Sequence, residues 1–318
     1  MKTYTLPTTD LHISRLAYGC MLMSRRAGQV PTAPAQLLAT ALEHDINFFD
    51  HADVYGRGQS EAVFGEALKQ LPGARQQVIL QSKCGIRSKD DPRPGDPARF
   101  DFSYEHIMES VNGSLRRLQT DYLDVLLLHR PDALVEPQEV ARAFDELHAA
   151  GKVRYFGVSN HSPAQIELLK KHVRQPLIVN QLEVNLLHSG MIREGILVNQ
   201  DAARYTAADG LLDYCRLNDI LVQAWSPVAG GRLIDPPQSA EAPVRAAAAA
   251  VARLAAEKHT SREAIALGWL LRHPAGIQPI IGTTNVERLR ASCEADAVSL
   301  SREEWYTLLA AARGEPVP

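Results

Sequence analysis

The stretch Phe48-Phe49-Asp50-His51-Ala52-Asp53-Val54-Tyr55-Gly56 passes directly from an apolar pair into a cluster of titratable side chains. A short apolar run that ends in acid, His and Tyr is typical of an α/β-barrel strand whose carboxyl end carries chemistry. The same pattern also fits a polar loop in which Asp53 or a neighbour caps the next helix. The positions of the other isolated titratable residues favour the first interpretation.

Similar apolar runs recur along the chain and alternate with segments of helical spacing. Residues 4–14 contain the turn signal Thr8-Thr9-Asp10 and predict a small N-terminal hairpin. The expected strands that follow are 14–20, 46–50, 78–83, 122–129, 153–159, 177–181, 220–225 and 278–281. The expected helices are 33–43, 60–69, 104–118, 137–149, 162–172, 207–217, 244–258, 261–271, 285–295 and 301–313.

This alternation predicts one α/β domain over residues 1–318, a (β/α)8 TIM barrel with an N-terminal β-hairpin and extra C-terminal helices. The nearly all-apolar run 122–129 is typical of a parallel strand that is buried on both faces. A doubly wound sheet is the alternative, but no Gly-x-Gly-x-x-Gly follows an early strand. Residues 90–101 and 186–206 have no clear period, and we expect loops there, the second folding over a site.

Composition excludes several classes of protein. The chain has 318 residues, of which 45% are hydrophobic and 22% charged, as in a soluble globular enzyme. A net charge of −3 gives no basic field for nucleic acid or an anionic membrane. We expect a cytoplasmic protein, because no signal peptide follows Met1 and no apolar stretch suits a membrane span. The cysteines have neither zinc-finger nor Cys-x-x-Cys spacing, which favours reduced thiols: Cys20, Cys84, Cys215 and Cys293.

Residues that follow the strands of a barrel meet at one face. Asp50 and Tyr55 follow the second expected strand, Lys83 ends the third and His129 ends the fourth. Any one of them alone fits a structural or solvated role, but four such residues from three consecutive strands predict an active site. The remaining strand ends contribute Ser159, Asn160, Gln181, Trp225, Ser226, Gly282 and Thr283.

Six motifs in chain order stand at these strand ends. They are Phe49-Asp50-x4-Tyr55-Gly56 with Glu61 and Gly65; Ser82-Lys83; Leu123-Asp124-x4-His129-Arg130-Pro131-Asp132; Gly157-Val158-Ser159-Asn160; Asn180-Gln181; and Pro279-Ile280-Ile281-Gly282 with Arg288. With them the chain resembles the aldo-keto reductases, and more closely their bacterial YdhF-like oxidoreductase branch. The resemblance covers essentially the whole chain.

The resemblance implies an oxidoreductase that reduces an aldehyde or ketone to an alcohol, with Asp50, Tyr55, Lys83 and His129 as catalytic residues. Tyr55 would donate the proton in reduction and accept it in oxidation. The Lys83 ammonium is expected to lower the pKa of Tyr55, whose reference value is about 10. Asp50 would hold Lys83 in place, and His129 would orient the carbonyl oxygen by a hydrogen bond.

The resemblance also implies NADP(H) as the cofactor, since no side chain can supply a hydride. Ser159, Asn160 and Gln181 are expected to bind the carboxamide of the nicotinamide, and Trp225 to face its ring. Arg288 on the last barrel helix favours a 2′-phosphate, and therefore NADPH over NADH. The expected cofactor contacts are Gly19, Cys20, Met21, Asp50, Ser159, Asn160, Gln181, Trp225, Ser226, Pro227, Val228, Gly230, Gly231, Arg232, Gly282, Thr283, Thr284, Asn285 and Arg288.

The chain departs from the family pattern at three positions. Ala291 and Ser292 stand where many members carry Glu and Asn to hold the adenine end, which bears on the strength of the NADP preference. His51 stands where Ser or Thr is commoner. A metal site built from His51, Asp53 and His129 is an alternative, but no His-x-x-x-His pair supports it and Lys83 would repel a cation. We expect no metal, and a structural role for Asp53.

Two other classes of function stay open. Lys83 could form a Schiff base in a lyase if its amine were desolvated and neutral. The chain could also be a cofactor-binding sensor or regulatory subunit, although the intact set of four residues argues against it. We expect a small-molecule carbonyl substrate bound by residues 21–28, 87–100 and 186–205, no nucleic-acid or membrane partner, and a monomer or weak homo-oligomer.

Overall fold

The computed structural model of the chain describes residues 1–24, 32–198, 200 and 208–316. Its eight central strands are β3 (Ala17–Gly19), β4 (Phe48–Asp50), β5 (Ile79–Cys84), β8 (Leu123–Leu128), β9 (Val153–Ser159), β10 (Leu177–Glu183), β11 (Leu221–Trp225) and β12 (Gln278–Ile281). They form a closed barrel in the order β3, β4, β5, β8, β9, β10, β11, β12, and every neighbouring pair is parallel. The predicted TIM barrel is therefore confirmed, and the doubly wound alternative is wrong.

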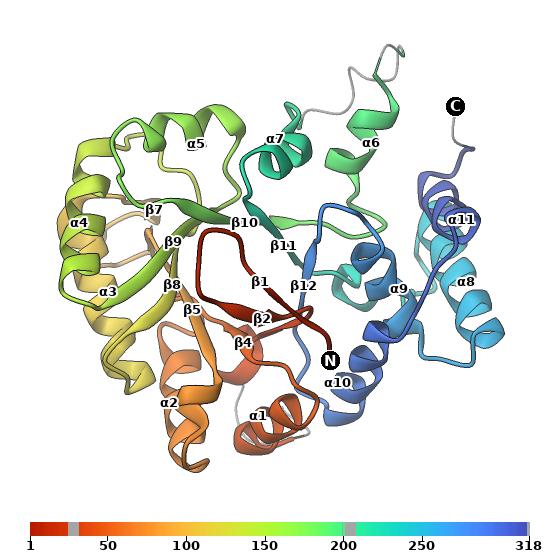
Figure 1. The fold of residues 1–318 in the computed structure, drawn as a ribbon, viewed down its shortest axis with the longest axis horizontal. Helices are drawn as coiled ribbons and strands as arrows, with labels where there is room; N and C mark the ends of the chain where they lie inside the picture. Colours follow the sequence, from red (N-terminus) through yellow and green to blue (C-terminus); the bar gives the residue numbers. More distant parts are fainter. Residues whose placement is uncertain (25–31, 199, 201–207, 317–318) are drawn as a thin grey trace.

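Helices surround the barrel (Figure 1). They are α1 (Pro34–Glu43), α2 (Gln59–Lys69), α3 (Tyr104–Leu118), α4 (Pro137–Ala149), α5 (Pro163–Lys170), α6 (Gly190–Ile196), α7 (Leu211–Leu217), α8 (Ala242–Glu257), α9 (Arg262–Leu271), α10 (Val286–Cys293) and α11 (Arg302–Arg313). The expected C-terminal addition is present: α11 packs along α8 at one edge of the molecule. Within the described ranges, no helix is both long and apolar enough to cross a membrane.

The predicted N-terminal hairpin lies across the amino end of the barrel (Figure 1). Strands β1 (Thr3–Thr5) and β2 (His12–Ser14) pair antiparallel. Leu6, Leu11 and Ile13 of the hairpin are buried in one apolar cluster with inward-facing strand residues such as Phe48 and Ile79. The hairpin therefore closes this end of the barrel, and only the carboxyl ends of the strands remain open for chemistry.

Two segments without a clear sequence period contain regular structure. Helix α6 occupies part of residues 186–206, where we expected a loop. It is one short helix with a single buried residue, Ile192, which is too little to give a periodic pattern. The expected loop 90–101 likewise contains β7 (Arg99–Phe100), which pairs with β6 (Ile86–Arg87). Residues 199 and 201–207, which include the predicted start of the helix now assigned as α7, lie outside the described residues.

Gly85 turns the chain out of β5 toward β6. Its φ of 100° lies in a region that side chains rarely adopt. A Cβ at this position would lie 2.3 Å from the ring of Phe102, which is only 2% exposed and cannot move aside. Both the backbone conformation and the space therefore require glycine at the end of the strand that carries Lys83.

We expect Gly85→Ala to lower the free energy of unfolding by about 2–4 kcal/mol, from backbone strain together with overpacking against Phe102. Gly73→Ala is the matched control, because Gly73 also has a positive φ, 78°, but a Cβ added there would meet no atom within 4 Å. Its cost should be about 1 kcal/mol. Urea unfolding measures both variants, and equal losses would contradict the role assigned to Phe102.

Candidate active site

The four expected catalytic residues come from three neighbouring strands of the barrel. Asp50 is the last residue of β4, and Tyr55 lies in the loop between β4 and α2. Lys83 lies near the carboxyl end of β5, and His129 directly follows β8. Parallel pairing of β4 with β5 and of β5 with β8 places these positions side by side. The structure thus brings all four together at the open end of the barrel.

Lys83 is at the centre of the site and is completely buried. Its ammonium donates three hydrogen bonds, to Asp50 Oδ2 at 2.8 Å, to the carbonyl oxygen of His51 at 2.8 Å and to Tyr55 Oη at 3.0 Å. Burial lowers the pKa of Lys83, but the charge of Asp50 and the contacts with Tyr55 outweigh it, so the pKa is raised. An ammonium with all three protons engaged is no nucleophile, which argues against a Schiff-base lyase.

Tyr55 accepts a hydrogen bond from Lys83, and a Lys ammonium can only donate. The hydroxyl proton of Tyr55 is therefore directed elsewhere. Burial raises the pKa of Tyr55, and the charge of Lys83 offsets this only in part, so the net shift is upward. The expected effect of Lys83, which lowers the pKa of Tyr55, is present, but burial disfavours the phenolate more than the ammonium favours it. Tyr55 is a protonated donor at neutral pH.

His129 lies beside Tyr55, with the two rings edge to face at 5.8 Å between centroids. Burial lowers the pKa of His129 to about 2, and the charges of Lys83 and Arg130 act in the same direction. The imidazole is therefore neutral and offers one N–H donor. Tyr55 and His129 together supply two donors that one substrate oxygen can share.

The residues expected to hold a carboxamide lie at the ends of β9, β10 and β11. Ser159 Oγ donates to the carbonyl oxygen of Gln181 at 2.8 Å. The side-chain amide of Asn160 donates to Ser159 Oγ at 2.8 Å and to the carbonyl oxygen of His129 at 3.2 Å. Trp225 Nε1 donates to Asn160 Oδ1 at 3.3 Å. These four expected residues thus form one hydrogen-bonded group next to His129.

A second group of expected contacts follows β11 and β12, which are neighbours in the barrel. Ser226, Ala229, Gly230 and Gly231 all have positive φ, so the backbone after β11 curves sharply. A Cβ at Gly230, Gly231 or Gly282 would meet no atom within 4 Å, so these backbones are open to a ligand. The remaining members of this group are Pro227, Val228, Arg232, Thr283, Thr284, Asn285 and Arg288, with both arginines exposed.

The expected cofactor contacts that follow β3 differ in how exposed their side chains are. Met21 is 53% exposed, whereas the Cys20 side chain is completely buried, with its Sγ near the carbonyl oxygen of Tyr18. The Cys20 thiol is therefore buried in the core, and the predicted contact of Cys20 with the cofactor could be made only by its backbone. Of the expected substrate-binding segments, residues 25–28, 199 and 201–205 lie outside the described residues.

His51 and Asp53 face the protein interior. The His51 ring packs edge-on against the Phe64 ring, with 4.5 Å between the ring centroids. Neither nitrogen of the His51 ring has a hydrogen-bond partner among the described residues. Burial lowers the pKa of His51 to about 3, so the ring is neutral. Lys83 binds the backbone carbonyl oxygen of His51 rather than its ring. Burial raises the pKa of Asp53 to about 7. Across the part of the chain that the structure describes, no three His, Cys, Asp or Glu side chains gather in a way that could hold a metal ion.

Gln181 is an expected site residue, but the other buried glutamines inside the barrel were not anticipated. Gln81 on β5 and Gln181 on β10 both donate to Asp50 Oδ1, at 2.6 and 2.9 Å. Gln223 on β11 accepts from both, and Gln278 on β12 extends the chain of amides. The available signal is a Gln at an inward position of the two-residue period, clearest in β11, where Gln223 is the single polar residue of the strand.

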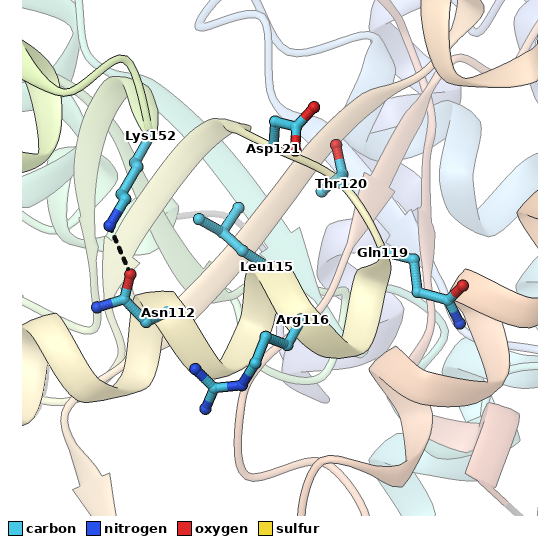
Figure 2. Close-up of a pocket in the computed structure, with 7 residues that line it drawn as sticks. All are labelled: Asn112, Leu115, Arg116, Gln119, Thr120, Asp121 and Lys152. Carbon is cyan, nitrogen blue, oxygen red and sulfur yellow. Dashed lines mark hydrogen bonds between the residues drawn. The ribbon is translucent and has the colours of Figure 1, made fainter.

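A surface hollow at the opposite end of the barrel offers no comparable chemistry (Figure 2). It is lined by Asn112, Leu115, Arg116, Gln119, Thr120, Asp121 and Lys152, from the end of α3 and the start of β9. Figure 2 shows Lys152 hydrogen-bonded to Asn112, at 2.7 Å, and no convergence of the other side chains. The candidate site is therefore the one at the carboxyl ends of the strands.

Comparison with known proteins identifies the same family along nearly the whole chain. The model of the Aldo/keto reductase family matches residues 15–313. Oxidoreductase YdhF of Escherichia coli is 38% identical over 289 residues, 89% of either chain. The 6-dehydroglucose reductase of Agrobacterium fabrum is 35% identical, over 96% of this chain and 97% of that protein. The holo structure of aldo-keto reductase AKR11C1 from Bacillus halodurans superimposes with a TM-score of 0.74 at 25% identity, over 99% and 98% of the two chains.

We expect His51→Leu to leave the free energy of unfolding within about 1 kcal/mol of the wild-type value, or to raise it, because the change removes buried polar nitrogens without partners. Thermal and urea unfolding measure the change. A loss of several kcal/mol would show that the His51 ring has a polar partner after all.

Proposed function

The chain belongs to the aldo/keto reductase family, and on that premise we propose that it reduces an aldehyde or ketone to the alcohol with NADPH as the cofactor. The observation that carries this proposal is the triple hydrogen bonding of the buried Lys83 ammonium, which joins Asp50 and Tyr55 beside a neutral His129. The intact set of four residues argues against a purely regulatory role.

The reaction requires a hydride and a proton. NADPH, when bound, would supply the hydride. Tyr55 supplies the proton, because its hydroxyl hydrogen is not used by Lys83 and its raised pKa keeps it protonated. Once the proton has left, the Lys83 ammonium at 3.0 Å stabilises the phenolate. Asp50 holds that ammonium from the opposite side, at 2.8 Å, and keeps it charged.

His129 positions the substrate oxygen. Its neutral imidazole can donate one hydrogen bond to the carbonyl and to the alkoxide that develops from it. A protonated His129 would add a second positive charge close to Lys83, and the low pKa of His129 prevents this. The roles are thus divided: His129 orients the oxygen and Tyr55 protonates it.

The polar groups present fit a nicotinamide carboxamide. Both amide hydrogens of Gln181 are engaged, by Asp50 Oδ1 and Gln223 Oε1, so the group that Gln181 can offer is the acceptor Oε1. An acceptor there suits the NH2 of a carboxamide. Ser159 Oγ has given its hydrogen to the carbonyl oxygen of Gln181 and can likewise only accept a further bond. Trp225, which is hydrogen-bonded to Asn160, offers an aromatic face.

The open glycine backbone after β11 suits a pyrophosphate, and the exposed Arg232 and Arg288 add positive charge. Arg288 on the first turn of α10 supports NADPH over NADH. The N-cap side chain of Asn285 already accepts from the amides of Glu287 and Arg288. The side chain of Arg288, rather than those amides, therefore carries the proposed preference.

The substrate class is best sought among aldehydes, including sugar aldehydes. A relative that is 35% identical is named 6-dehydroglucose reductase. The guanidinium of Arg130, which follows His129 in the chain, lies 5.7 Å from the centroid of the Trp225 ring and adds a hydrogen-bond donor at this end of the barrel. Such a donor suits an oxygen-rich substrate.

We expect the purified protein to oxidise NADPH, faster than NADH, with members of a panel of aldehydes, ketones and sugar aldehydes that includes 4-nitrobenzaldehyde. Tyr55→Phe should lower kcat by at least about 100-fold, the scale of a lost general acid. It should leave NADPH affinity, measured by fluorescence titration, within about twofold, because Tyr55 contributes proton transfer rather than binding energy. Undiminished turnover by Tyr55→Phe would contradict the mechanism.

The two directions should respond to pH in opposite senses. Reduction needs the protonated Tyr55, whose pKa is raised, so kcat for reduction should hold through neutral pH and fall only at alkaline pH. Alcohol oxidation needs the phenolate and should accelerate as the pH rises over the same range. Steady-state rates in both directions test this. A fall in kcat for reduction as the pH rises from about 6 to 7 would instead indicate that His129 titrates, because the ordinary pKa of histidine lies in that range.

A further inference from the structure

Four glutamines lie inside the barrel, where branched apolar residues usually fill the space. Gln81, Gln181, Gln223 and Gln278 are each at most 2% exposed. A buried amide costs free energy unless its hydrogen bonds are made. Their placement on four different strands therefore calls for a specific set of partners.

The hydrogen bonds form a closed ring beneath Lys83. Gln81 Nε2 donates to Asp50 Oδ1 at 2.6 Å and to Gln223 Oε1 at 2.8 Å. Gln181 Nε2 donates to the same two oxygens, at 2.9 and 3.0 Å. Asp50 Oδ1 and Gln223 Oε1 thus each accept two bonds, and the other oxygen of Asp50 faces Lys83.

Each glutamine amide has a fixed orientation, because the groups at the two ends of the network can only accept hydrogen bonds. Gln223 Nε2 donates to Gln278 Oε1 at 2.9 Å, and Gln278 Nε2 donates to the backbone carbonyl of Ser14 at 2.7 Å. A carbonyl at one end and a carboxylate at the other both require donors. The cost of this arrangement falls on Gln81, because its Oε1 is buried without a partner among the described residues. If the Gln81 amide were turned over, its Oε1 would face Asp50 Oδ1, and two acceptors would then be in contact. An unpaired Oε1 costs less free energy than that contact.

We propose that Gln81 is a positioning residue for catalysis, which acts through Asp50. With Gln223 as its anchor, it holds the Asp50 carboxylate with its Oδ2 toward Lys83, which in turn holds Tyr55. Gln181 completes the ring and offers its free oxygen to the carboxamide, so one network orients the proton donor and the cofactor end. This proposal rests on the proposed reductase function.

The groups that titrate around Asp50 are few. Lys83 and Tyr55 contact it through the bonds given above, His51 follows it on the chain, and the Cys20 thiol after β3 feels its charge. His51 stays neutral, with its pKa lowered to about 3 by burial, and burial likewise keeps Cys20 a thiol. A changed titration of Lys83 on removing Gln81 therefore reports on the contact of Lys83 with Asp50.

The test compares Gln81→Met, which keeps the side-chain length but removes the donor, with Gln175→Met. Gln175 is a matched control: its Nε2 also donates to a carboxylate, Asp145 Oδ1 at 2.8 Å, and its Oε1 is also buried without a partner among the described residues, but it precedes β10 at the far end of the barrel. Gln81→Met should lower kcat by about tenfold or more, as loss of a supporting hydrogen bond does at other sites. KM for the carbonyl and Kd for NADPH should stay within about twofold of wild type, since no binding group is removed.

The Lys83 ammonium should also titrate at lower pH in Gln81→Met, because the Asp50 carboxylate that raises the pKa of Lys83 is no longer held against it. Gln175→Met should match the wild type in kcat and in the titration of Lys83. If Gln81→Met does not fold, Gln223→Met tests the same ring, since both donors then lose the acceptor that anchors them. An unchanged kcat and an unchanged Lys83 titration, or a fall in thermal stability alone, would overturn the proposal.

Failure of the proposed function gives a different result. In that case the wild-type protein itself fails to oxidise NADPH with every carbonyl in the panel. The role of Gln81 is then tested by the side-chain ¹⁵N resonance of Lys83, which should titrate at lower pH in Gln81→Met than in wild type. Identical titrations would overturn the positioning role without reference to turnover.

Discussion

A lysine ammonium enclosed by protein on every side must be matched by partners, because an unpaired buried charge costs several kcal/mol. Lys83 meets this requirement with a carboxylate, a backbone carbonyl and a phenol, and each has a fixed place on the barrel. Asp50 ends the neighbouring strand, and the loop that carries Tyr55 returns over it. The geometry of the active site follows from satisfying this one charge.

The same constraint explains features away from the mouth of the barrel. Asp50 accepts three hydrogen bonds, and two of them come from glutamines that replace apolar filling inside the barrel. The hairpin closes the amino end with apolar side chains, so water does not compete for these groups from below. On the outer face of β5, Ser82 donates to Glu61 at 2.6 Å, and Arg117 binds the other oxygen of Glu61 at 2.8 Å. The strand that carries Lys83 is therefore fixed from both sides.

Sequence patterns predicted the barrel because its strands are apolar and evenly interrupted by helices, and they placed Asp50, Lys83 and His129 because strand ends share one face. They did not predict α6, which buries one residue, or the glutamine ring, whose members are far apart in the chain. The net upward shift of the Tyr55 pKa was not predicted for another reason: the charge of Lys83 is visible in the sequence, whereas the burial that outweighs it exists only in the fold.

The charge state of Lys83 is the central claim, and ¹⁵N NMR of the lysine side chains measures it directly. The Lys83 resonance can be assigned from its absence in Lys83→Met. The structure predicts an ammonium at neutral pH that titrates only above the usual range for lysine, and an earlier titration in Asp50→Asn. A neutral Lys83 amine at pH 7 in the wild-type protein would contradict the account.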